Sequence, residues 1–391
     1  MPDQLPKIAW LSPLPPQRSG IANYSYWLVK ALKPYFEIDL YYDGEETTPL
    51  ADEFDVYPQS AFSGRYKIYD EAVYHLGNHS DFHGGIYKLA WDFPGTVVLH
   101  DYNLSAFMYE TFYRRNEEQM YRQALIDGYG DEGLRAFRAL MDGHVPDHAA
   151  FPMSHAVVSR SRKAVVHHRW VKAQLGGRDH VEVIPHFARL NRRPTREEIE
   201  RFKKKFRVRD DHFVVSCLGF VNSNKLPRLQ AEVVRRLIAD GYPVQLVFAG
   251  EPAPQVKSLE AEVQAGDDII FTGYLDETDY FSAVFASDVI VNLRNPSMGE
   301  ASGTLMHALA AARPTIVSDL NQYREFPDKV CWKLADGENQ ADELYAYLRA
   351  LLSDKYLRAA ISNNAAEYVR NVFGWEKIIA RWRQVLSEKS T

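Results

Sequence analysis

A chain of 391 residues is long enough for two or more domains, each with its own hydrophobic core. Its hydrophobic fraction of 46% and charged fraction of 25% are typical of a globular protein, and its net charge of −6 gives no electrostatic basis for binding nucleic acid. The two cysteines, Cys217 and Cys331, exclude a disulfide framework and show no metal-ligand spacing, so no metal is expected. The first residues lack the apolar core of a signal peptide, and no later run is long enough to span a membrane, which favours a cytoplasmic protein.

In the first half of the chain, apolar runs alternate with segments of helical spacing. Strands are predicted at residues 8–11, 36–41, 71–76, 95–99, 156–158 and 181–185, and a helix at 21–32. Residues 105–150 are expected to form a mostly helical insertion over the carboxyl edge of the sheet. Tyr and Trp are concentrated between residues 24 and 170, where we expect a bulky core rather than sugar-stacking surfaces.

A charged interval at 192–201 separates this series from a second one and is the predicted domain boundary. Further strands are predicted at 213–218, 244–249, 269–271, 289–291 and 315–317, with helices at 227–239 and 375–387. The predicted fold class is α/β, with two doubly wound domains in tandem and a ligand cleft between them. The basic run 203–207 is expected to be a solvated helix face, and a weak membrane-surface patch is the alternative.

The most informative motif follows the predicted strand 289–291. Glu300 precedes Ser302, Gly303 and Thr304, and an apolar segment at 305–312 comes next. Ser302 or Thr304 can cap a helix here, and the free N–H groups at its start favour an anion. Glu300 can accept hydrogen bonds from hydroxyl groups, so the motif suits a nucleotide sugar. The alternative is an ordinary capped helix whose glutamate favours the helix dipole.

Two motifs in the first half of the chain end predicted strands. Ser19 and Gly20 open the first helix, where a glycine allows a phosphate to approach the backbone, although a simple turn glycine is the alternative. His100 follows the strand 95–99 and can donate to a sugar hydroxyl, with Asp101 fixing its tautomer; a surface histidine that caps the next element is the alternative.

The remaining histidines of this region carry weaker signals. His167 and His168 are predicted to lie on a helix as surface or filler residues. His186, at the domain junction, stays ambiguous.

Two loops of the second series complete the candidates. Lys225 closes the loop 219–225 after the first strand, where a cation could neutralise a diphosphate, although a lone lysine in a loop is usually solvated. Gly273 and Tyr274 follow the strand 269–271, and the backbone of this turn could pair with a nucleobase edge; a simple strand exit is the alternative.

In this order, the motifs resemble the retaining glycosyltransferases of family four, which have the GT-B architecture of two facing Rossmann-like domains. The resemblance covers nearly the whole chain, through Ser19-Gly20, His100-Asp101, 183–185, 219–225, 247–251, 271–274, 300–317 and 373–377. It implies an acceptor-binding domain at 1–188, completed by the returning helix 376–391, and a donor-binding domain at 189–375. It also implies transfer of a hexose from a UDP- or GDP-linked sugar, with retention and without a cofactor or an obligatory metal.

The resemblance also assigns residues to roles. The implied catalytic residues are His100 near the transferred sugar, Lys225 on the diphosphate and Glu300 on the sugar hydroxyls. The implied donor-binding residues are Ser19, Gly20, Asn222, Gly273, Tyr274, Arg294, Ser302, Gly303, Thr304 and His307. The implied partners are the nucleotide-sugar donor and a glycan or lipid-linked acceptor, with weak peripheral association at the inner membrane face.

Two positions depart from the family pattern. Phe220 stands where the family usually has an arginine, so a positive charge on the diphosphate is missing or comes from Arg294 or Arg18. His307 aligns with the family's second glutamate, which usually holds the ribose. These changes keep two alternatives open: a non-catalytic nucleotide-sugar-binding protein, and another GT-B enzyme such as an epimerase or hydrolase. A nicotinamide oxidoreductase is disfavoured because neither domain has G-x-G-x-x-G after its first strand. The donor base and sugar, the acceptor and the oligomeric state stay open.

Overall fold

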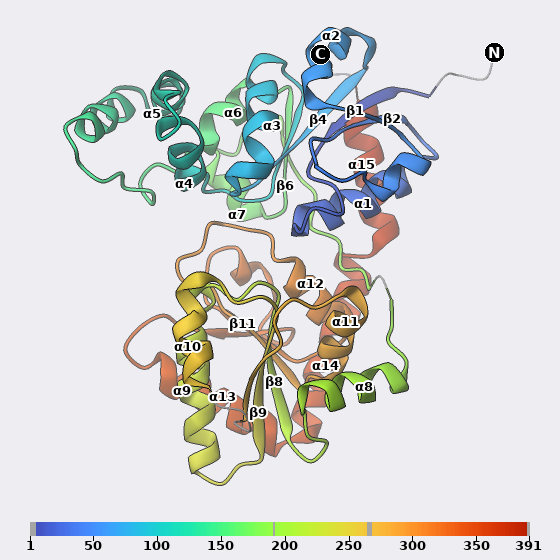
Figure 1. Ribbon diagram of the computed structural model, residues 1–391, viewed down its shortest axis with the longest axis vertical. Coiled ribbons are helices and arrows are strands. Elements are labelled where there is room, and N and C mark those ends of the chain that lie inside the picture. Colours follow the sequence, from blue (N-terminus) through green and yellow to red (C-terminus); the bar gives the residue numbers. More distant parts are fainter. Residues whose placement is uncertain (1–4, 191, 264–267, 389–391) are drawn as a thin grey trace. The chain divides into compact units, whose positions relative to one another are not determined.

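The computed structural model describes residues 5–190, 192–263 and 268–388. These residues form two compact units (Figure 1). The first unit comprises Met1–Pro185, Met298–Ala301 and Glu376–Thr391, and the second comprises His186–Ser297 and Ser302–Trp375. Each unit is built on one parallel sheet, so the predicted α/β class is confirmed.

The sheet of the first unit has seven strands within the described residues, in the order β3-β2-β1-β4-β5-β6-β7. They are β1 (Lys7–Leu11), β2 (Glu37–Tyr41), β3 (Asp55–Tyr57), β4 (Glu71–Leu76), β5 (Thr96–Leu99), β6 (Lys163–Val166) and β7 (Val181–Val183). The strand order reverses between β1 and β4, and the carboxyl ends of strands at such a switch point form a crevice suited to ligands.

The predicted strand at 156–158 is wrong. These residues lie in α6 (Ser154–Arg160), and the strand of this region is β6, a few residues later. A short run of buried apolar residues fits a helix as well as a strand, because its length does not reveal a period. Strand β3 was not predicted, because its three residues are too few for a pattern.

Helices cover both faces of this sheet. The helices of the first unit are α1 (Gly20–Leu32), α2 (Phe62–Arg65), α3 (Ser80–Asp92), α4 (Ser105–Met108), α5 (Glu118–Met141), α6, α7 (Arg169–Gln174) and α15 (Trp375–Ser387), with a π-helical turn at Tyr109–Tyr113. The helical insertion predicted at 105–150 is therefore confirmed as helical.

The last helix returns to the first unit, as predicted. Trp382 of α15 is fully buried, with its ring 6.0 Å from that of Trp10 in β1. Lys163 Nζ donates to the carbonyl oxygen of Val385 at 2.7 Å. Many aromatic side chains of this unit belong to its core, including the buried Tyr41 and Tyr74, which supports the expected bulky core.

The sheet of the second unit has six strands in the described part of the chain, in the order β10-β9-β8-β11-β12-β13. They are β8 (Phe213–Leu218), β9 (Val244–Ala249), β10 (Ile269–Phe271), β11 (Val289–Asn292), β12 (Thr315–Ser318) and β13 (Trp332–Leu334). Only β13 was not predicted, since its three residues, Trp332, Lys333 and Leu334, include a charge. The order reverses between β8 and β11, which places a second switch point there.

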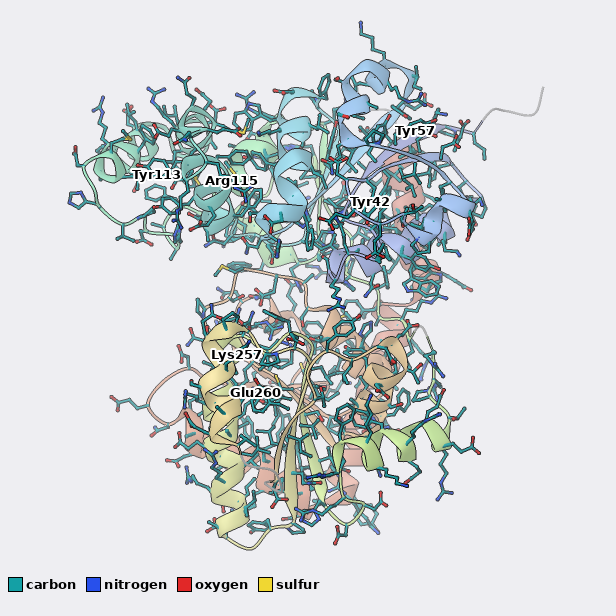
Figure 2. All side chains as sticks on the ribbon, in the orientation of Figure 1. Tyr42, Tyr57, Tyr113, Arg115, Lys257 and Glu260 are labelled. Carbon is teal, nitrogen blue, oxygen red and sulfur yellow. The ribbon has the colours of Figure 1, made fainter. Side chains whose placement is uncertain are left out.

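The helices of the second unit are α8 (Arg196–Phe206), α9 (Pro227–Ala239), α10 (Lys257–Glu262), α11 (Glu277–Ala286), α12 (Gly303–Ala310), α13 (Gln340–Ser353) and α14 (Lys355–Val372). Figure 2 shows Lys257 and Glu260 on α10. None of the helices in the described ranges is long and apolar enough to cross a membrane.

Helix α8 carries the basic run of the sequence. Thr195 and Glu198 form a capping box at its start, and the buried Phe202 anchors its apolar face. Lys203 and Lys205 form ion pairs with Asp210 and Asp279 at 2.7 and 2.6 Å. These pairs support the predicted solvated helix face over a membrane-surface patch.

Candidate functional site

The switch point of the second unit brings the loop after β8 against the start of α12. Gly219 has φ +74°, and a Cβ there would lie 2.9 Å from Thr304 Cγ2 and 3.5 Å from Lys225 Nζ. Only glycine accommodates both the backbone angle and the close approach. Two predicted groups, the lysine and the helix N-terminus, therefore flank one glycine.

Lys225 is buried rather than solvated, with only 4% of its surface exposed. Its Nζ donates to the carbonyl oxygen of Leu218, the last residue of β8. Asn222 begins the short turn that carries Lys225, and its carbonyl oxygen accepts the Lys225 N–H at 3.2 Å. The Asn222 Oδ1 atom is buried and makes no hydrogen bond to the residues described. The loop thus holds one cation at the carboxyl end of the central strand.

The start of α12 is capped as the motif predicts. Ser302 Oγ accepts the N–H of Leu305 at 3.3 Å, and Ser302 itself is buried. Asn292, the last residue of β11, was not anticipated. Its Oδ1 lies 3.3 Å from Ser302 Oγ and 3.0 Å from Thr304 Oγ1. The only sign of Asn292 in the sequence was its position, as a polar residue at the end of an apolar strand.

His307 lies within α12, one turn after the cap. Its Nδ1 is 2.9 Å from Tyr280 Oη. Burial, with the nearby His186, lowers the pKa of His307 to about 4, so its ring is neutral at pH 7. His186 Nδ1 donates to the Phe187 carbonyl at 2.8 Å, and its Nε2 lies 3.8 Å from the position of a Cβ on Gly303. The residue that the sequence resemblance aligns with a glutamate is therefore a neutral imidazole.

The other predicted residues of the second unit lie at strand exits. Arg294 follows β11 and is buried, and its Nη1 donates to the Leu293 carbonyl at 2.6 Å. Phe220, in contrast, is 54% exposed. Gly273 has φ +68°, and the next residue, Tyr274, donates its N–H to Glu251 Oε2 at 3.0 Å. A glutamate thus engages the backbone N–H that was expected to face a base.

In the first unit, Ser19 and Gly20 open α1. Ser19 Oγ accepts the Ile21 N–H at 3.2 Å, so it is the N-cap. Gly20 is exposed, and no described atom lies within 4 Å of a Cβ built on it. Neither φ nor packing requires glycine at this position.

His100 is buried among other histidines. Its Nε2 lies 2.9 Å from His75 Nδ1, and its Nδ1 lies 3.2 Å from His167 Nε2. Asp101, expected to fix the tautomer, accepts the Asn78 N–H at 2.9 Å through Oδ2. The prediction that His167 is a surface or filler residue on a helix is wrong, because it directly follows β6 and is 4% exposed.

His168, predicted with it, is also buried, at 8% exposure, and precedes α7. A histidine pair after a short apolar run gave no sign of burial, because the strand before it was itself missed.

Glu300 lies in the segment Met298–Ala301, which packs with the first unit. Its Oε2 accepts the Met298 N–H at 2.8 Å, and the Ala301 N–H donates to the His100 carbonyl at 3.1 Å. Gly299 has φ +67°, and a Cβ there would be 2.7 Å from Tyr102 Cβ. The segment therefore docks tightly at the end of β5 and brings Glu300 next to the backbone of His100.

Comparison with known proteins matches residues 212–354 to the family model of the glycosyl transferases group 1. Three solved structures cover 98% of this chain. Anabaena HepE in complex with UDP has a TM-score of 0.70, 14% identity and 100% of its own chain covered. Sucrose-phosphate synthase from Thermosynechococcus elongatus has a TM-score of 0.66 and 16% identity, with 98% of its own chain covered. A glycosyltransferase from Rickettsia africae has a TM-score of 0.67 and 14% identity, with 100% of its own chain covered. No curated protein matches the sequence.

The chain has the GT-B fold. Apart from Met298–Ala301, the part that matches the group 1 family model lies in the second unit, and it contains Lys225, Arg294 and α12. His100, Ser19 and Gly20 lie outside it. For these residues the similarity is one of fold.

We predict that Gly219→Ala destabilises the protein by about 1–3 kcal/mol, because an L side chain at positive φ is strained and the new Cβ meets Thr304. Urea unfolding measures the change. Gly20→Ala is the matched control, with no described neighbour near its Cβ and an expected change within about 0.5 kcal/mol. Equal stabilities of the two variants would contradict the close approach at Gly219.

We predict that acid weakens the fold between pH 6.5 and 4. Burial lowers the pKa of His83, His186 and His307 to about 4 each, below the unfolded value of 6.5. The unfolded chain therefore binds more protons in this window, so the unfolding free energy falls as the pH falls. Within this window, each histidine lowers the unfolding free energy by roughly 1.4 kcal/mol for each unit by which the pH falls. Urea unfolding at pH 7 and pH 5 tests this, and His83→Asn should reduce the difference by one histidine's share. An unchanged difference would show that folding does not lower the pKa of His83.

Proposed function

We propose that this chain is a retaining hexosyltransferase that transfers a hexose from a nucleotide diphosphate sugar to a glycan, a lipid-linked oligosaccharide or a related acceptor. One observation carries the proposal: Lys225 Nζ and the N-terminus of α12 flank Gly219 at the switch point of the second sheet. A cation and free helix N–H groups are what a leaving diphosphate needs as negative charge develops on it. The structures of Anabaena HepE with UDP and with UDP-glucose support a donor of this class.

In this proposal the second unit makes most of the donor contacts and the first unit binds the acceptor. Lys225 contacts the diphosphate, and Ser302, Gly303 and Thr304 offer it backbone N–H groups. Arg294 is buried at the end of β11 and supplies the second positive charge that Phe220 lacks. The remaining donor contacts are assigned to Ser19, Gly20, Asn222, Gly273, Tyr274 and His307.

The chemistry follows from these charges. The bond from the anomeric carbon to the diphosphate oxygen breaks, the acceptor oxygen bonds to that carbon on the same face, and the acceptor proton passes to the leaving phosphate oxygen. Glu300 Oε2 already accepts the Met298 N–H, which suits a hydrogen-bond acceptor for sugar hydroxyls better than an attacking nucleophile. Because Lys225 and α12 supply the positive charge, we expect turnover to persist in EDTA. We place the reaction in the cytoplasm, at the inner membrane face when the acceptor is lipid-linked.

A thermal-shift screen with UDP-, GDP-, ADP- and TDP-sugars tests the donor site. A ligand that binds only the native state raises the midpoint in proportion to RT ln(1 + [L]/Kd). The donor that shifts the midpoint is then incubated with acceptors, and NMR of the anomeric proton reports retention. No shift with any donor would refute the donor site.

The second candidate function is nucleotide-sugar binding without catalysis. It is favoured by the exposed Phe220 in the lysine loop and by the neutral His307. Donor binding without turnover against any acceptor would support it. Release of free sugar or of an epimerised donor without an acceptor would instead identify a hydrolase or an epimerase.

A further inference from the structure

Three histidines of the first unit come from three neighbouring strands. His75 lies in β4, His100 directly follows β5 and His167 directly follows β6. The register aligns Leu76 with Leu99, and Leu99 with Val166. His100 and His167 are therefore level, and His75 lies two residues earlier. Because side chains two residues apart share a face of a sheet, all three imidazoles point to the same side.

The hydrogen bonds among these rings have only one possible direction when the rings are neutral. His167 Nδ1 lies 2.9 Å from the carbonyl oxygen of Ile184, which can only accept, so Nδ1 carries the proton. The bare Nε2 of His167 then accepts from His100 Nδ1, and the bare Nε2 of His100 accepts from His75 Nδ1. Each ring is therefore an Nδ1–H tautomer.

The surroundings of the three rings disfavour a charged imidazole. His75, His100 and His167 are 0%, 6% and 4% exposed. The Tyr24 ring packs against all three, and the Trp10 ring lies 4.6 Å from that of His75. Burial lowers the pKa of His75 well below its usual range.

Two other functions do not fit this chain of rings. Its far end is a backbone carbonyl, which cannot pass a proton on, so the rings do not form a proton relay. In the described ranges no group of three or more His, Cys, Asp or Glu side chains could hold a metal ion. Positioning is the role that the geometry leaves.

We propose that His75 and His167 are positioning residues: they hold His100 in its Nδ1–H tautomer and so fix the peptide whose carbonyl oxygen accepts the Ala301 N–H, beside Glu300. The buried ring of His100 is held at both nitrogens, so its contribution to the site is made through this backbone contact. The effect on turnover rests on the proposed function, in which Glu300 binds sugar hydroxyls. The tautomer does not depend on it.

Two substitutions of His167 separate positioning from packing. In His167→Gln, the side-chain amide reaches the place of Nε2, so its oxygen can still accept from His100. In His167→Asn, the amide reaches only the place of Nδ1, which keeps the Ile184 contact and loses the one to His100. NMR of protein with ¹⁵N-labelled histidine reports which ring nitrogen carries the proton.

In the wild type we expect Nδ1–H tautomers for all three rings. His167→Asn should release His100 into a mixture of tautomers and lower kcat at least 10-fold, while His167→Gln should keep the tautomer and stay within about 3-fold of wild-type kcat. His83→Asn removes a neighbouring buried histidine whose Nδ1 donates to the His75 carbonyl. It should leave the tautomer of His100 unchanged and change kcat by less than about 2-fold. If His167→Asn does not fold, two variants of His75 replace it in the test. His75→Asn keeps a donor to His100 and should keep its tautomer, whereas His75→Phe removes the donor and should release it.

Equal losses in the two His167 variants, or a proton on Nε2 of His100 in the wild type, would overturn the proposal. If no donor is turned over by the wild type, the proposed function fails, and the tautomers still decide whether the three rings act as described. If turnover is present but the tautomer pattern is absent, only this inference fails.

Discussion

Lys225→Met is expected to lower kcat/KM for the donor by about 10²–10³-fold while the fold is kept. Methionine preserves most of the buried aliphatic stem of Lys225, so the packing at the end of β8 changes little. The variant loses the cation that lies beside Gly219 and the start of α12. Charge that grows on the leaving diphosphate would then be stabilised by the helix N-terminus without the lysine. Initial rates with the donor identified by the thermal-shift screen measure the effect.

The control for this variant is Lys257→Met. Lys257 is an exposed lysine on α10 of the same unit, and its loss should change kcat/KM by less than about 2-fold (Figure 2). Circular dichroism and the thermal midpoint confirm that both variants fold. Wild-type turnover in Lys225→Met would remove Lys225 from the diphosphate site.

Glu300→Gln is expected to weaken binding of the nucleotide sugar while leaving binding of the free nucleotide diphosphate nearly unchanged. Glutamine still offers an oxygen to the Met298 N–H, so the segment that docks on the end of β5 keeps its shape. The charge is lost, and hydrogen bonds from sugar hydroxyls to a carboxylate are worth roughly 1.5–3 kcal/mol. Affinity for the nucleotide sugar should fall by about 10–150-fold. Affinity for the free nucleotide diphosphate, which has no sugar, should stay within about 2-fold.

Two further variants show what a different outcome would mean. Glu300→Ala removes the acceptor for Met298 as well and should lose more activity than Glu300→Gln. Glu260→Gln, at a half-buried glutamate on α10, is the matched control (Figure 2). Equal losses of affinity for the sugar nucleotide and for the bare nucleotide would show that Glu300 only shapes the loop.

Much of the fold could be predicted from local pattern. The helices at 227–239 and 375–387 were predicted with the bounds that the structure shows, because each repeats its apolar residues at helical spacing over more than three turns. The parallel α/β class followed from strands alternating with such helices. The errors fall on short elements: the run at 156–158 belongs to α6, and β3 and β13 have three residues each.

The sequence by itself determined the features that depend on neighbours along the chain. The cap at Ser302, the helix that follows it and the place of Lys225 after a central strand all follow from residue order. Only the tertiary structure decided which distant side chains meet. Asn292 reaches Ser302 and Thr304 across 10 and 12 residues. His75, His100 and His167 become neighbours only because three parallel strands end side by side, which places residues 25 and 67 positions apart within hydrogen-bond distance.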